Sequence, residues 1–123
     1  MPKATTINWL AEPEEHDYPA ARAYLNIVYD DKTVDKMVEQ LRKAPVTSFK
    51  AKDIFRASGL SLLGVSNSHV EKDRKKVLAG KALSPLLLVR DTVHGKVVIA
   101  DGYHRMCAIY LFDEDAPIFC KIV

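Results

Sequence analysis

Residues 97–105 read Val97-Val98-Ile99-Ala100-Asp101-Gly102-Tyr103-His104-Arg105. An apolar run typical of a buried strand meets Asp-Gly, and polar side chains then begin a segment that is apolar again as far as Phe112. The first turn of a helix has unpaired backbone N–H groups and a positive partial charge, and Gly102 lets a bound group approach the backbone closely. Arg105 adds a planar cation, and His104 can move a proton near neutral pH. This junction therefore predicts an anion site, most naturally for phosphate.

The same junction has a purely structural interpretation. Asp101 would cap the helix, and Arg105 would pair with Asp101 or with a carboxylate of residues 113–115. An Arg105→Ala variant would distinguish the anion site from the structural interpretation. We expect weaker ligand binding with the fold retained if the phosphate site is real, and unfolding if Arg105 is a structural ion-pair residue.

The surrounding pattern predicts an α+β protein. Before the junction, strands are expected at Leu86–Val89 and Lys96–Ala100, joined by a turn at His94-Gly95. After the junction we expect a helix over Tyr103–Phe112 and a last strand over Pro117–Val123. In that helix the i, i+3, i+4 pattern places Tyr103, Met106, Cys107, Tyr110 and Leu111 in the core.

The first half is expected to be helical. A first helix begins at Asp17-Tyr18-Pro19 and buries Ala21, Tyr24, Leu25 and Val28, and a second runs from about Lys32 to Ala44 and buries Val34, Met37, Val38 and Leu41. Together they form an N-terminal helical pair over residues 17–44. A short helix at residues 52–58 ends at Gly59, residues 60–68 form a loop, and a helix over residues 69–79, capped by Ser68, ends at Gly80.

Length and composition limit the class of protein. The chain has 123 residues, 48% hydrophobic and 28% charged, which predicts one domain over residues 1–123 and excludes a disordered chain or a disulfide miniprotein. No apolar run spans a bilayer and Met1–Ala4 lead into no hydrophobic stretch, so we expect a cytoplasmic protein with no membrane partner. Cys107 and Cys120 are then expected to be reduced core thiols.

Charge is unevenly distributed along the chain. The overall net charge is only +2, but residues 32–81 hold 12 basic and 5 acidic side chains, a net charge of +7. This segment is either a solvated helical surface or the footprint of a phosphate-bearing partner.

Residues 70–123 resemble the ParB/sulfiredoxin-like superfamily. The resemblance rests on Leu83-Ser84-Pro85, the hairpin, the Asp-Gly-X-His-Arg turn at residues 101–105, the apolar helix and the closing Ala-Pro-Ile strand. It implies a small mixed sheet with packed helices, preceded here by the 17–44 helical pair, which would be a cap or a dimer surface. It also implies that Gly102, Tyr103, His104 and Arg105 bind nucleotide phosphates, with Asp101 ahead of them.

This sequence differs from members of that family in ways that argue against two of their functions. Sulfiredoxin has its catalytic cysteine where this sequence has Tyr103, and Cys107 lies a helical turn further on, so sulfiredoxin activity is not expected. Partition proteins usually carry paired arginines at this turn and a downstream helix-turn-helix domain, and because the sequence ends at Val123 a role in DNA segregation is not expected.

Residues outside the turn are secondary candidates for the same site. Lys52 and the helix face with His69, Lys72 and Asp73 would line the nucleotide or a second substrate, and His69 with Asp73 at i and i+4 is spaced to share a metal. The run from Glu14 to Asp17 is a candidate general base, represented by Glu15, or a Mg²⁺ site. The structural alternative for the helix face is a solvent-exposed surface with an incidental histidine. The alternative for the acidic run is that acidic residues favour a helix N-terminus.

Three functions follow. The first is a nucleotide-dependent enzyme, a phosphotransferase or nucleotide hydrolase that uses ATP, ADP or CTP with Mg²⁺, with His104, Asp101 and Glu15 as catalytic candidates. The second is a non-enzymatic module in which a nucleotide or another phosphorylated small molecule sets a conformation or a homodimer. The third is a nucleic-acid-processing domain, supported only by the basic segment.

Overall fold

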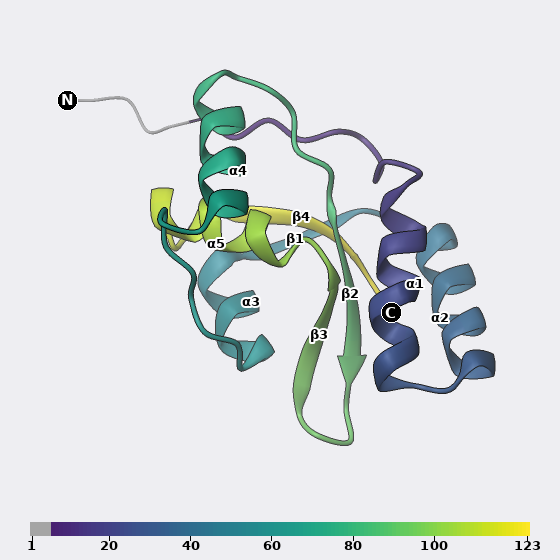
Figure 1. Cartoon of the computed structure of the whole chain (residues 1–123). Coiled ribbons are helices and arrows are strands. Elements are labelled where there is room, and N and C mark those ends of the chain that lie inside the picture. The colour runs from purple at the N-terminus through teal and green to yellow at the C-terminus, as the bar shows by residue number, and fades with distance from the viewer. Residues whose placement is uncertain (1–5) are drawn as a thin grey trace.

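The computed structural model describes residues 6–123 and has an α+β fold, as the sequence pattern predicts (Figure 1). Its sheet has four strands in the order β1-β4-β2-β3, which are β1 (Thr47–Lys50), β4 (Pro117–Ile122), β2 (Leu86–Asp91) and β3 (Lys96–Asp101). Strands β2 and β4 run parallel and the other two pairs antiparallel, so the sheet is mixed. The expectation of no leader sequence rests on the first residues of the chain. Residues 1–5 lie outside the part of the chain that the structure describes.

The predicted helical pair covers one face of the sheet. Helices α1 (Asp17–Val28) and α2 (Asp31–Lys43) bury an apolar set against β2 and β3, made of Tyr18, Ala21, Leu25, Val34, Val38, Leu41, Leu87, Val89, Val98 and Ala100. Asp30 caps α2 by accepting a hydrogen bond from the Thr33 N–H at 2.8 Å. The prediction that Tyr24 and Val28 are buried is wrong, because α2 and the sheet cover only the opposite side of α1.

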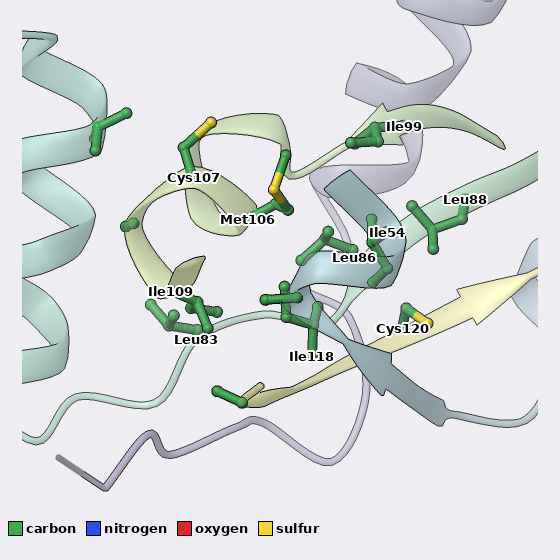
Figure 2. Close-up of a cluster of buried hydrophobic side chains, with 14 of the residues drawn as sticks. Ile54, Leu83, Leu86, Leu88, Ile99, Met106, Cys107, Ile109, Ile118 and Cys120 are labelled. Carbon is green, nitrogen blue, oxygen red and sulfur yellow. The ribbon is translucent and has the colours of Figure 1, made fainter. Parts of the chain in front are cut away.

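Three helices pack on the other face. Helices α3 (Ala51–Ser58), α4 (Ser68–Leu78) and α5 (Tyr103–Phe112) surround the larger core, part of which is drawn in Figure 2. Helix α5 lies between α3 and α4 and is buried on several sides through its centre, from Met106 to Ile109. The predicted stripe is therefore correct for Met106 and Cys107 and wrong for Leu111, which is exposed. None of the helices within residues 6–123 has the length and apolar character needed to cross a bilayer.

Two local details differ from the expectations. Asn67, not Ser68, caps α4, because its side-chain oxygen accepts from the N–H groups of His69 and Val70 at 3.0 and 3.2 Å. Strand β1 was not expected, because all four of its side chains are exposed and show no alternation of apolar and polar residues. The expected helix ends at Gly59 and Gly80 are confirmed by φ angles of 66° and 74°.

Backbone hydrogen bonds and an ion pair hold the segment before α1 against the sheet. The Leu10 N–H donates to the Leu83 carbonyl at 2.9 Å, and the Leu83 N–H donates to the Asn8 carbonyl at 2.8 Å. Lys121 on β4 is 1% exposed, and its ammonium donates to the Arg42 carbonyl at 2.9 Å and pairs with Glu12 at 3.1 Å. These contacts place the start of α1 against the end of the sheet where β3 leads into α5.

Gly102 is the tightest backbone position of this junction. Its φ is +108°, and a Cβ added there would lie 2.5 Å from Leu86 Cγ and 3.2 Å from Arg105 Nη2. We expect Gly102→Ala to lower the free energy of unfolding by about 2–4 kcal/mol, because strain and a core clash add together. Gly95→Ala is the matched control, since Gly95 also has a positive φ, 63°, but open space at the Cβ position. It should cost only about 1 kcal/mol in urea unfolding, and equal costs would contradict the clash.

Candidate functional site

A cleft of about 540 Å³ opens where α1 begins and β3 ends. Its walls come from the start of α1, the face of α4, the segment before β2 and the first turn of α5. They are formed by Glu14, His16, Asp17, Ala20, His69, Lys72, Asp73, Lys76, Ala82, Leu83, Ser84, Asp101, Gly102, His104 and Arg105. The cleft therefore brings together most of the predicted turn and the predicted face of α4.

A one-residue bulge in β3 aims Asp101 into this cleft. Leu88 pairs with Ile99, but its neighbour Leu87 pairs with Asp101, so Ala100 is the extra residue. Cross-strand partners share a face of the sheet, and Leu87 faces α1 and α2. Without the bulge, strict alternation would turn Asp101 to the opposite face, away from α1.

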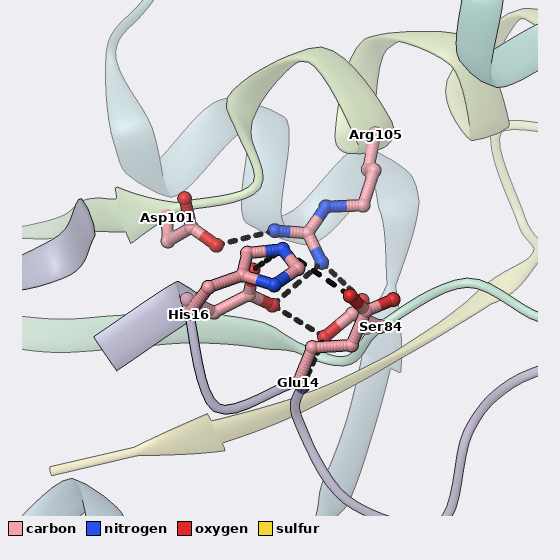
Figure 3. A network of polar contacts seen from close by, with 6 residues as sticks. Glu14, His16, Ser84, Asp101 and Arg105 are labelled. Carbon is pink, nitrogen blue, oxygen red and sulfur yellow. Dashed lines mark hydrogen bonds and ion pairs between the residues drawn. The ribbon is translucent and has the colours of Figure 1, made fainter. Parts of the chain in front are cut away.

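Arg105 is held by protein groups on the floor of the cleft (Figure 3). Its Nη2 lies 2.6 Å from Asp101 Oδ2, and its Nη1 lies 3.4 Å from Asp17 Oδ2 and donates to the Ser84 carbonyl. The Ser84 hydroxyl donates to Asp17 and accepts from the Glu14 N–H at 3.0 Å. The side chains of Arg105 and Asp17 are 13% and 8% exposed, so this is a buried network.

The expected pairing of Arg105 with Asp101 is confirmed, whereas its other partner is Asp17 rather than a carboxylate of residues 113–115. Asp101 does not cap α5, because the N-cap residue is Gly102 and no side chain caps that helix.

The electrostatics of the floor raise the affinity of Asp101 for a proton. Burial, together with the nearby Asp17 carboxylate, raises the pKa of Asp101 to about 6, although the Arg105 guanidinium opposes the shift. Two carboxylates that share one guanidinium leave the group with a net charge of −1 when both are ionised. A proton on Asp101 removes that excess charge.

The rim of the cleft holds a pair of histidines. The rings of His69 on α4 and His104 on α5 lie 4.8 Å apart between centroids. Burial and the neighbouring His69 lower the pKa of His104, whereas burial raises the pKa of Asp73. His16 Nε2 lies 3.2 Å from Glu14 and 3.3 Å from Asp17. Asp101, His104 and Asp73 are thus all shifted toward their neutral forms, a pattern typical of functional sites.

Three predicted site residues lie outside the cleft walls. Tyr103 turns away, and its hydroxyl donates to the Ser61 carbonyl. Glu15 pairs with Arg42 at 2.6 Å on the surface, and Lys52 pairs with Asp115 at 2.7 Å. The structure does not bring Glu15 or Lys52 to the turn at residues 101–105.

Ser84 was missed as a site residue by sequence reasoning. The only signal was its position, a small polar residue before Pro85 and a buried strand, where its hydroxyl needs a partner.

Metal ligation by the protein alone is not supported. Within residues 6–123, no three or more His, Cys, Asp or Glu side chains are grouped so that they could hold a metal ion. Of the residues expected to do so, Glu14, His16, Asp17, His69 and Asp73 line the same cleft without forming such a group.

No family model matches this sequence, and neither the curated proteins nor the solved structures contain a match. The resemblance to the ParB/sulfiredoxin-like superfamily therefore stays a prediction.

Truncating Arg105 should destabilise the fold rather than only weaken binding. We expect Arg105→Ala to lower the free energy of unfolding by about 3–5 kcal/mol, because it leaves Asp17 and Asp101 buried without their cation. Urea unfolding gives the value, and Arg56→Ala, on exposed α3 surface, is the control. A loss as small as that of the control would return Arg105 to the role of a ligand-binding residue.

The raised pKa of Asp101 predicts a specific dependence of stability on pH. A carboxyl with a higher pKa in the folded state than its ordinary 3.8 binds its proton more tightly when folded. Its contribution to stability is therefore lost as pH rises from about 4 to about 6. Asp101→Asn removes this titration, so its stability relative to wild type should rise by on the order of 2 kcal/mol across that range. Urea unfolding at each pH tests this, and a difference that stays constant across the range would contradict it.

Proposed function

We propose that the cleft binds a phosphorylated small molecule, with a nucleotide as the first candidate. The observation that carries the proposal is the meeting of cationic and donor groups at the rim. Lys72 and Lys76 on α4 line the cleft together with the uncapped first turn of α5, and the rings of His69 and His104 are adjacent there. Backbone N–H groups at a helix start and lysine ammonium groups are common phosphate ligands.

The distribution of charge directs the phosphates to the α4 side. On the floor, the charge of Arg105 is already offset by Asp17 and Asp101, so that side attracts an anion less than the lysines of α4 do. The volume of about 540 Å³ suits a small ligand. Glu14 and Asp73 are the carboxylates that would hold a Mg²⁺ ion arriving with a nucleotide, and that ion would offset phosphate charge.

His104 is the residue best suited to proton transfer. Its lowered pKa keeps the ring neutral at pH 7, and a neutral ring can accept a proton. In phosphoryl transfer, the acceptor oxygen would form a bond to the terminal phosphorus as the bond to the leaving diphosphate breaks. The acceptor's hydroxyl proton would pass to His104.

A binding module without turnover is the alternative, and one observation favours it. Arg105, the cation best suited to transition-state charge, is engaged by protein groups at 2.6 and 3.4 Å. The nucleic-acid alternative has less support, because the basic segment is divided between α2 on one face of the sheet and α4 on the other (Figure 1).

Ligand binding is tested by thermal shift with ATP, ADP, CTP and pyrophosphate, each with and without Mg²⁺. A ligand at a hundred times its dissociation constant should stabilise the fold by about 2.7 kcal/mol, a shift of several degrees. The double variant Lys72→Ala, Lys76→Ala should lose at least about 1.4 kcal/mol of binding, a tenfold weaker affinity, whereas Lys75→Ala on the same helix should bind normally. Lys75 is exposed and outside the cleft.

Two results would contradict the proposal: no shift with any of these ligands, or equal shifts in the double variant and wild type. Release of inorganic phosphate distinguishes enzyme from binding module. An enzyme should lose turnover in His104→Gln while retaining nucleotide binding, and a binding module should show no turnover in either protein.

A further inference from the structure

The outer edge of β3 is open. This strand is the last in the sheet, and beyond its pairing with β2 it makes no backbone hydrogen bond that would cover its other edge within residues 6–123. The bulge at Ala100 leaves Lys96–Ile99 as a regular stretch, of which three residues are apolar. An open edge of this kind is a template for pairing with another strand. The opposite edge, β1, is shorter and ends in Lys50.

The flank of α1 beside this edge is exposed and uncharged. It consists of Ala20, Ala23, Tyr24, Ile27 and Val28, and Ile27 is 84% exposed. After Asp17 the only charged residue of α1 is Arg22, which reaches Asp35 of α2 at 2.5 Å. Tyr24 lies about 200° around the helix from Arg22, so the apolar flank points away from α2. Uncharged exposed patches of this kind commonly mark interaction surfaces.

The two features lie at one margin of the molecule. Helix α1 packs on β3 and less extensively on β2, so it lies over this edge of the sheet. Strands are spaced by about 4.8 Å, so a helix axis midway between β2 and β3 would lie roughly 5 Å from a two-fold axis running between two paired β3 edges. Two α1 helices would then stand about 10 Å apart, the upper end of the usual spacing of packed helices.

We propose that the chain forms a two-fold homodimer through antiparallel pairing of the outer β3 edges, with the two α1 flanks packed against each other. The axis passes close to Val98, because paired residues must face the same side of the joined sheet. Antiparallel α1 helices set small Ala20 opposite Ile27 of the second copy, and Ala23 opposite its Tyr24. The order of small and large residues along α1 is therefore complementary to itself.

The size of the surface predicts a dimer that dissociates on dilution. Both elements are about 20 Å long, from six residues of strand and 12 of helix. A stable interface covers about 800 Å² per partner, roughly a tenth of the 7273 Å² surface of this chain. A strip of that length reaches this area only if both elements take part, so disturbing either should separate the copies.

Sedimentation across a dilution series tests the dimer. Wild type should approach twice 13.8 kDa when concentrated and return to 13.8 kDa when dilute. Ile27→Lys should raise the dissociation constant about tenfold or more, because it buries an ammonium group in an apolar contact. Leu78→Lys on α4 is the control, since Leu78 is also an exposed apolar residue, at 56%, but lies on the other face of the sheet. It should dimerise as wild type does.

Hydrogen exchange locates the interface without a substitution. Amides of β3 that point outward should exchange more slowly at high than at low protein concentration. The proposal is overturned if wild type stays at 13.8 kDa at its highest soluble concentration. It is equally overturned if Ile27→Lys dimerises as tightly as Leu78→Lys, or if β3 exchange is independent of concentration.

Discussion

A largely buried guanidinium between two carboxylates organises this molecule. Arg105 belongs to α5, Asp101 to β3 and Asp17 to α1, and their contacts join both helical layers across the end of the sheet. Ser84 completes the set by accepting from Arg105 at its carbonyl and donating to Asp17 from its hydroxyl. None of these charges is stable when buried alone, so the start of α1, the bulge in β3 and the first turn of α5 must form together.

This constraint divides the cleft into a rigid floor and a titratable rim. On the floor Arg105 contacts Asp17, Asp101 and the Ser84 carbonyl, and within residues 6–123 no buried side-chain polar atom lacks a partner. At the rim, His104 and Asp73 are shifted toward neutrality by burial while Lys72 and Lys76 keep cationic surface beside them. In the proposed function the rim would bind the anion and accept the proton, while the floor positions the turn that carries His104.

Helix α1 serves both proposals. Its first residues form the network on the floor, and its exposed flank lies beside the open edge of β3. Ala20 belongs to both surfaces, since it lines the cleft and begins the uncharged flank. A second copy packed on α1 would stand next to the mouth of the cleft, so ligand binding and self-association would share one helix.

Local pattern in the sequence determined most of the elements. Apolar periodicity, Pro19 and the glycines were sufficient to predict all five helices and three of the four strands, because these signals act within a few residues. Tertiary structure alone decided the rest. Asp17 and Arg105 are 88 residues apart, and no local signal pairs them. The bulge at Ala100, which turns Asp101 toward them, depends on the register with β2. Burial in that assembly, rather than the residue types themselves, raises the pKa of Asp101 to about 6, and the same assembly gives Arg105 two carboxylate partners.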